Sequence, residues 1–224
     1  MKRALQIGFY VLLGTLVIAA LAFKIFQPVQ VVPRIRLSPG FALITQDGGR
    51  ITNEDLRGKF VVFNFTYTNC EAPCGYMNDT IVAIQSRLDE INLGNIELLF
   101  VTISFDPEID TPEKLKTYAD SLGADPDQWI FATTEDQILL KAIIGAGFEA
   151  YYKQNEDGTF TFDPKFVLVD GWGIVRGEYR YQTQVPDTDR ILRHIQVLSD
   201  EVQNSTGSAS LAYEAAHYFL CYTP

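Results

Sequence analysis

The alternation of apolar runs with helically spaced apolar residues predicts an α/β fold. Continuous apolar runs at 60–67, 97–105 and 165–169 are typical of strands that are buried on both faces of a sheet. Because these runs alternate with amphipathic segments, we expect a central mixed sheet flanked by helices. The expected strands are 41–44, 60–67, 97–105, 129–132, 149–153, 159–162, 165–169 and 174–179, and the expected helices are 78–93, 111–122, 134–147 and a last helix from 187 or 188.

The strand at 60–67 leads into two cysteines at CxxxC spacing, Cys70 and Cys74. The next segment is helical in pattern, with an apolar face of Ile81, Ile84, Leu88 and Ile91 and a stop at Gly94. Because the N-terminal end of a helix favours negative charge, this arrangement favours thiolates over thiols. Thiolates attack disulfides or bind soft metals such as Cu(I).

The cysteine count supports a reactive pair rather than a scaffold of disulfides. The chain has three cysteines in 224 residues, and the third, Cys221, lies at the far end. Three are too few to staple a domain of this size. We therefore interpret Cys70 and Cys74 as a site, with a structural disulfide across the turn as the alternative.

The N-terminal segment 4–23 contains twenty residues and no charge. As a helix it would span roughly 30 Å, the thickness of a bilayer core. Lys2 and Arg3 precede it, which predicts a single-pass inner-membrane anchor with a cytoplasmic N-terminus and the domain on the periplasmic or extracytoplasmic side. A cleaved signal peptide is the alternative, with a site at 20–22, but the apolar run is longer than a usual signal core.

The rest of the chain divides by composition into a tether, a domain and a tail. We expect an anchor at 1–26, a proline-containing tether at 27–40, an α/β domain at 41–203, and a polar linker with a hydrophobic tail at 204–224. The apolar stretch 211–222 is too short to span a membrane, so it should dock on its own domain or on a partner.

The charge of the chain excludes nucleic acid as a ligand. The net charge is −10, and residues 1–24 carry three basic and no acidic residues. The remainder therefore holds 15 basic against 28 acidic residues, a balance that repels nucleic acid.

Two segments resemble the Sco/SenC family of membrane-anchored, thioredoxin-like proteins. They are FNFTYTNCEAPC, ending at Cys74, and ISFDPEIDTP at 103–112, and the similarity runs from about 41 to 202. The resemblance implies a thioredoxin-like fold, copper binding by Cys70 and Cys74, and a role in assembling the binuclear copper centre of cytochrome oxidase. Some members of the family act as thiol–disulfide reductases.

The resemblance also implies a third copper ligand, a histidine just before the strand at 165–169. Counting from the end of that strand places it at Phe162, and the chain has no histidine between 1 and 193. Two thiolates alone can hold Cu(I) in a linear geometry. Candidate substitutes, each also explained by packing or by a surface position, are Met77, His194, His217 and Cys221.

Two further features each have a functional and a purely structural interpretation. Pro164 stands where thioredoxin-like reductases place a cis-proline, although Asp-Pro in a plain turn explains it as well. Asp106, Glu108 and Asp110 could form a metal cluster, whereas capping and solvation of the following helix is the simpler interpretation.

Three functions therefore remain open at this point. The first is a factor that holds Cu(I) on Cys70 and Cys74 and delivers it to an oxidase subunit. The second is a copper-independent thiol–disulfide reductase in which one cysteine attacks and the other resolves. The third is a non-catalytic accessory subunit of a membrane respiratory complex, held by its anchor and its tail.

Overall fold

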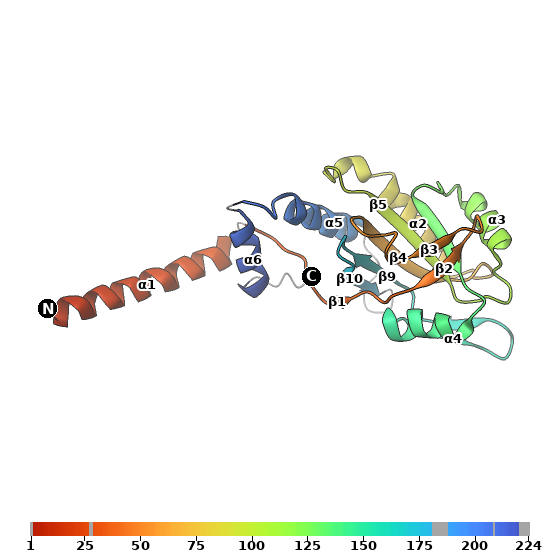
Figure 1. Cartoon of the computed structure of the whole chain (residues 1–224), viewed down its shortest axis with the longest axis horizontal. Coiled ribbons are helices and arrows are strands. Elements are labelled where there is room, and N and C mark those ends of the chain that lie inside the picture. Colours follow the sequence, from red (N-terminus) through yellow and green to blue (C-terminus); the bar gives the residue numbers. More distant parts are fainter. Residues whose placement is uncertain (1, 27–28, 181–187, 208, 220–224) are drawn as a thin grey trace. The chain divides into compact units, whose positions relative to one another are not determined.

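A computed structural model of the chain describes residues 2–26, 29–180, 188–207 and 209–219 (Figure 1). It divides into two units, which are treated separately. One comprises 34–199, and the other comprises 1–33 together with 200–224.

The 34–199 unit is built on a mixed sheet, as expected. Among the described residues the sheet has eight strands, in the order β1-β10-β9-β4-β5-β6-β2-β3. Strands β4, β5, β6 and β10 run in the same direction, and β9, which lies between β4 and β10, runs antiparallel to them. The strands are β1 (Arg36–Leu37), β2 (Ala42–Thr45), β3 (Arg50–Thr52), β4 (Phe60–Thr66), β5 (Leu98–Ser104), β6 (Trp129–Thr133), β9 (Lys165–Val169) and β10 (Ile174–Arg180).

The central strands are buried on both faces, as their continuous apolar runs predict. Every residue of β4, β5 and β9 is buried. Because side chains alternate along a strand, Val61, Phe63 and Phe65 of β4 share one face. There they pack in one cluster with Ile143 and Phe148. Helices α2 and α4 lie on opposite sides of the sheet (Figure 1).

The helices differ from expectation mainly in their length. Those of the sheet unit are α2 (Cys74–Gln85), a 3₁₀ turn η1 (Leu88–Glu90), α3 (Pro112–Leu122), α4 (Gln137–Leu140), a π-helix η2 (Lys141–Gly147) and α5 (Thr188–Gln203). The expected helix 78–93 is wrong at both ends, because the helix starts at Cys74 and stops at Gln85. Ile81 and Ile84 are fully buried, but Leu88 and Ile91 are only partly buried, so packing does not carry the helix further.

Two segments differ from the structure that the sequence pattern predicted. The expected strands at 149–153 and 159–162 are observed as β7 (Tyr152–Gln154) and β8 (Phe160–Phe162), which pair with each other in a separate sheet. Glu149 has a positive φ of 52°, which delays the start of the strand. The expected tether also contains β1, which pairs with β10 and is held by an ion pair between Arg36 and Glu178 at 2.6 Å.

The second unit contains α1 (Lys2–Phe26) and α6 (Ala209–Phe219). Within the described ranges, one helix is long and apolar enough to cross a membrane, at Arg3–Ala22, with a mean hydropathy of 2.1. Helix α6 covers most of the expected tail segment, and 220–224 lie outside the described residues. His217 Nε2 lies 2.9 Å from Glu201 Oε1 in this unit.

The close contact between the turns at Gly58 and Gly171 generates a prediction for stability. Gly58 donates its N–H to the carbonyl of Gly171 at 2.9 Å, and a Cβ at Gly171 would stand 3.0 Å from the backbone of Gly58. We expect Gly171→Ala to lower the free energy of unfolding by about 1–3 kcal/mol. Gly145→Ala is the control, because a Cβ there meets nothing within 4 Å, and it should leave urea denaturation unchanged or shifted slightly toward stability.

Candidate functional site

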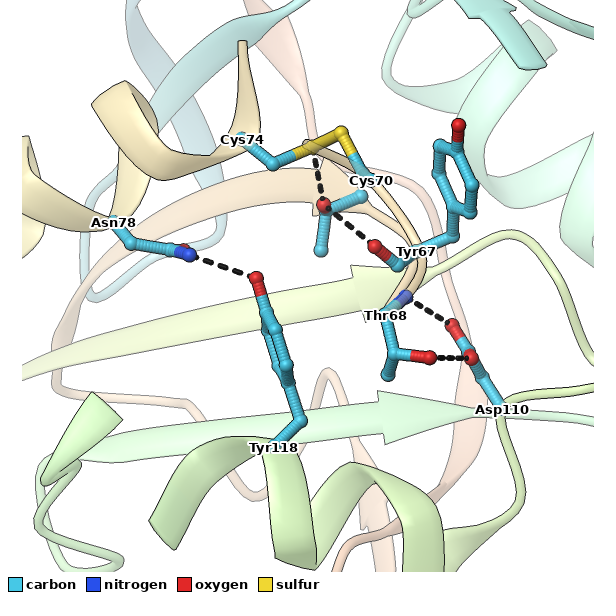
Figure 2. The surroundings of a disulfide bond; sticks show 8 residues. Tyr67, Thr68, Cys70, Cys74, Asn78, Asp110 and Tyr118 are labelled. Atoms are coloured by element: carbon cyan, nitrogen blue, oxygen red, sulfur yellow. Dashed lines mark hydrogen bonds between the residues drawn. A yellow bond between two sulfur atoms is a disulfide. The ribbon is translucent and has the colours of Figure 1, made fainter. Parts of the chain in front are cut away.

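The loop between β4 and α2 brings the two predicted cysteines together. Cys70 and Cys74 form a disulfide with a Cα–Cα distance of 5.9 Å (Figure 2). The Cys70 N–H bonds to the carbonyl of Tyr67 at 3.2 Å, and Cys74 is the first residue of α2. The sulfurs therefore lie where a buried strand meets the start of a helix, as the sequence pattern indicated.

The two sulfurs have different surroundings. Cys74 is fully buried, and the hydroxyl of Thr66, at the end of β4, donates a hydrogen bond to its Sγ at 2.8 Å (Figure 2). Cys70 is partly exposed. An external thiolate can therefore reach Cys70, and Cys74 is then the leaving group, with Thr66 placed to donate to the new thiolate. Sequence reasoning missed Thr66, because a threonine at the end of a strand is ordinary.

Asp110 holds the cysteine loop on the sheet. Its carboxylate accepts the Thr68 N–H at 2.8 Å and the Thr68 hydroxyl (Figure 2). It also accepts the hydroxyl of Ser104 at 2.5 Å. Asp110 is completely buried. Capping and solvation of α3 therefore does not explain this residue, and Thr111 caps that helix instead by accepting the Lys114 N–H.

The acidic segment does not form a metal cluster. In the part of the chain that the structure describes, no group of three or more His, Cys, Asp or Glu residues could hold a metal ion. Asp106 is buried, and this burial raises the pKa of its carboxyl, with further contributions from the negative charges of Asp110 and Glu108. Glu108 is exposed and accepts a hydrogen bond from Gln137 at 3.0 Å.

Aromatic rings pack beside the cysteine loop. The ring of Tyr67, three residues before Cys70, lies 5.0 Å from that of Phe160 and 6.3 Å from that of Phe162, both on β8. Phe105, at the end of β5, packs at 5.2 Å from Phe162. Phe105 and Phe160 also line a cavity of about 250 Å³, together with Asp106, Glu108 and Tyr152. The position that the family resemblance assigns to a histidine is thus part of an aromatic cluster.

The candidate substitute ligands have other surroundings. Met77 is fully buried on α2. His194, on α5, is 2% exposed and its Nδ1 lies 2.8 Å from the Tyr179 hydroxyl. His217 is paired with Glu201 in the other unit, and Cys221 lies outside the described residues. The structure therefore brings together Cys70 and Cys74 but adds none of these four to a described metal cluster.

The cis-proline of the loop is Pro73, not Pro164. Among the described residues, the cis peptide bond is Ala72–Pro73, inside the CxxxC loop. The plain-turn interpretation of Pro164 is therefore the one that the structure supports.

The mixed sheet, with a disulfide between its central strand and the following helix, defines a protein of the thioredoxin-like class. The family model described as SCO1/SenC matches residues 31–219. The chain therefore belongs to the SCO1/SenC family, and the resemblance seen in the sequence is confirmed.

Three relatives illustrate the similarity. The SCO1 protein homolog of Bacillus subtilis is 30% identical over 152 residues, 67% of this chain and 77% of its own length. The structure of BsSco, described as a Sco-family cytochrome c oxidase assembly protein with a disulfide switch, matches with a TM-score of 0.65 and 27% identity, covering 76% and 98% of the two chains. Arabidopsis thaliana ScoI with copper bound shares the fold, with a TM-score of 0.61 and 24% identity, covering 71% and 98%.

The anchoring role of Asp110 generates a prediction for stability. In Asp110→Asn one carboxylate oxygen is replaced by an amide NH₂ group, which cannot accept the hydrogen bonds that Thr68 and Ser104 donate. We therefore expect a loss of about 2–3 kcal/mol in the free energy of unfolding of the detergent-solubilised chain. Reduction of the disulfide by dithiothreitol should also become faster, because the loop loses its link to Thr68 and Ser104. The control is Glu108→Gln, an exposed change expected within about 0.5 kcal/mol. Equal behaviour of the two variants would contradict this role.

His194 generates a prediction for pH dependence. Burial first, and then the charges of Arg190 and Arg193, lower the pKa of His194 to about 4. The unfolded chain binds this proton near pH 6.5 and the folded chain does not, so stability should fall as pH falls from about 6.5 to 4, by up to about 3 kcal/mol. His194→Gln should remove this part of the slope in urea titrations at several pH values. An unchanged slope would show that other groups cause it.

Proposed function

We propose that this protein serves assembly of the copper centre of cytochrome oxidase through the Cys70–Cys74 pair, as a membrane-anchored copper-delivery or thiol-redox factor. The observation that carries the proposal is the disulfide after β4, in which Cys70 is partly exposed and Cys74 is buried against Thr66. The relatives support it, because BsSco is described as an oxidase assembly protein and Arabidopsis ScoI was solved with copper.

The oxidised loop must gain two electrons and two protons before it can act. Reduction opens the Cys70–Cys74 bond and leaves two sulfurs at the start of α2, where the helix dipole favours thiolates. Thiolates are the ligands that select Cu(I) among available metals. Delivery then requires exchange of the sulfurs of this protein for ligands of the oxidase subunit, and the partly exposed Cys70 is the one that a partner can reach first.

The same pair can act as a reductant of a partner disulfide. Cys70 attacks one partner sulfur and forms a mixed disulfide, and Cys74 then attacks Cys70 Sγ and releases the partner as a dithiol. This second function is favoured by the absence of histidine from residues 1–193. It needs the two cysteines and no metal.

The N-terminal helix supports a location at the membrane. The window Arg3–Ala22 suits a single span, and Lys2 and Arg3 at its start favour a cytoplasmic N-terminus in the inner membrane. The sheet unit would then lie on the extracytoplasmic side, where the oxidase copper centre is assembled and where disulfides persist.

Single cysteine variants test the proposal and the order of the two sulfurs. In the reduced full-length chain we expect Cys70→Ser and Cys74→Ser each to abolish stoichiometric Cu(I) binding in competition with a cuprous chelator. With a disulfide-bonded peptide from the copper-binding segment of the oxidase, Cys74→Ser should accumulate a mixed disulfide at Cys70. Cys70→Ser should not, because Cys74 is buried.

Glu108→Gln is the control and should behave as the parent chain. The proposed function fails if the parent neither binds Cu(I) nor reduces the peptide. The assigned order of attack fails if Cys70→Ser traps the peptide instead.

A further inference from the structure

We infer that the reduced Cys70–Cys74 pair accepts copper only as Cu(I) and reduces Cu(II) instead of holding it, because the described residues group no His, Asp or Glu with the two cysteines, and aromatic rings pack on Tyr67 at the start of the cysteine loop. The aromatic wall consists of Tyr67, Phe105, Phe160 and Phe162. This inference rests on the proposed copper-handling function and concerns the oxidation state of the copper that the site can take.

The donor set separates the two states of copper. Soft thiolates suit Cu(I), which needs few ligands, whereas Cu(II) prefers a tetragonal arrangement with nitrogen or oxygen ligands. The loop supplies the two sulfurs of Cys70 and Cys74. A site for Cu(II) would need at least one further hard or imidazole ligand from the surrounding residues.

The oxygens of Asp110 and Thr66, beside the cysteine loop, are already committed to the structure. Both carboxylate oxygens of Asp110 accept hydrogen bonds from Thr68, and one also accepts that of Ser104. The hydroxyl of Thr66 is bonded to Cys74 Sγ and is neutral. The described residues contain no third His, Cys, Asp or Glu grouped with the pair.

One ring nitrogen of each histidine is also engaged. The chain has two histidines. His194 Nδ1 is bonded to the Tyr179 hydroxyl, and His217 Nε2 is paired with Glu201. Rings occupy the space that a ligand from β8 would use, since Phe160 and Phe162 pack on Tyr67, next to the cysteine loop.

The resulting reaction balances without any further reagent. Two Cu(II) ions each take one electron from the dithiol, the Cys70–Cys74 bond forms, and two Cu(I) ions and two protons are released. The described structure contains the oxidised product of this step, with Cα atoms 5.9 Å apart. The two cysteines are therefore placed to form the disulfide that this step requires.

The inference is tested by adding copper(II) sulfate to the reduced full-length chain without oxygen. We expect the paramagnetic Cu(II) signal to disappear, the Cys70–Cys74 disulfide to form as seen by peptide mapping, and two equivalents of Cu(I) to be recovered by a cuprous chelator. A long-lived Cu(II)–thiolate complex in the parent chain would overturn the inference.

A histidine placed in the aromatic wall should reverse this behaviour. In Phe162→His we expect a persistent Cu(II) signal with a thiolate charge-transfer band and roughly tenfold or tighter retention of Cu(II). Thr161→His is the matched control on the same strand. Thr161 is exposed, and successive residues of a strand point to opposite faces, so this variant should reduce Cu(II) as the parent does.

The outcomes separate this inference from the proposed function. If Phe162→His folds with a parent-like circular dichroism spectrum but still loses Cu(II), the assignment of the aromatic wall is wrong. If the parent reduces Cu(II) but neither binds Cu(I) nor reduces the oxidase peptide, the reduction of Cu(II) by the pair stands, whereas Cu(I) retention and the proposed function fail.

Discussion

The carboxylate of Asp110 is the contact on which the site depends. It is completely buried, and it joins the end of β5 at Ser104 to the loop after β4 at Thr68. Neighbouring parallel strands end together, so one short side chain can link both. The cysteine loop is therefore attached to the most buried part of the sheet, and the position of Cys70 follows from the register of β4 and β5.

The same arrangement produces the chemical difference between the two sulfurs. Strand β4 ends at Thr66, which is buried and donates to Cys74, while the chain between them passes outward through Cys70. A turn of this kind exposes its first cysteine and encloses the second at the start of the helix. In the proposed reaction this asymmetry sets the order of the two sulfurs. Cys70 forms the mixed disulfide with the partner, and Cys74 then attacks Cys70 Sγ.

The aromatic wall and the cysteine pair together define what the site can bind. Tyr67 and Phe105 extend the apolar core up to the loop, and the β7–β8 hairpin adds Phe160 and Phe162. The phenylalanine rings of this wall stabilise the hairpin by burial, but they provide no lone pair for a metal. Membership of the SCO1/SenC family accompanies this fold, and Phe162 places a ring, not a metal ligand, against Tyr67 near the cysteine loop.

The sequence by itself determined the order of strands and helices, the apolar N-terminal helix and the placement of Cys70 and Cys74 between a strand and a helix. These features are local, since periodicity, glycines and the spacing of two residues decide them. The tertiary structure alone decided the features that join distant segments. From the sequence, Asp110 is interpreted as part of a helix cap, but in the structure it binds Thr68, 42 residues earlier in the chain. Likewise, the packing of Phe162 on Tyr67 is visible only in the structure. The end of α2 at Gln85 likewise depends on tertiary packing, because Ile81 and Ile84 are buried within the helix. The local sequence pattern does not show which isoleucines the fold will bury.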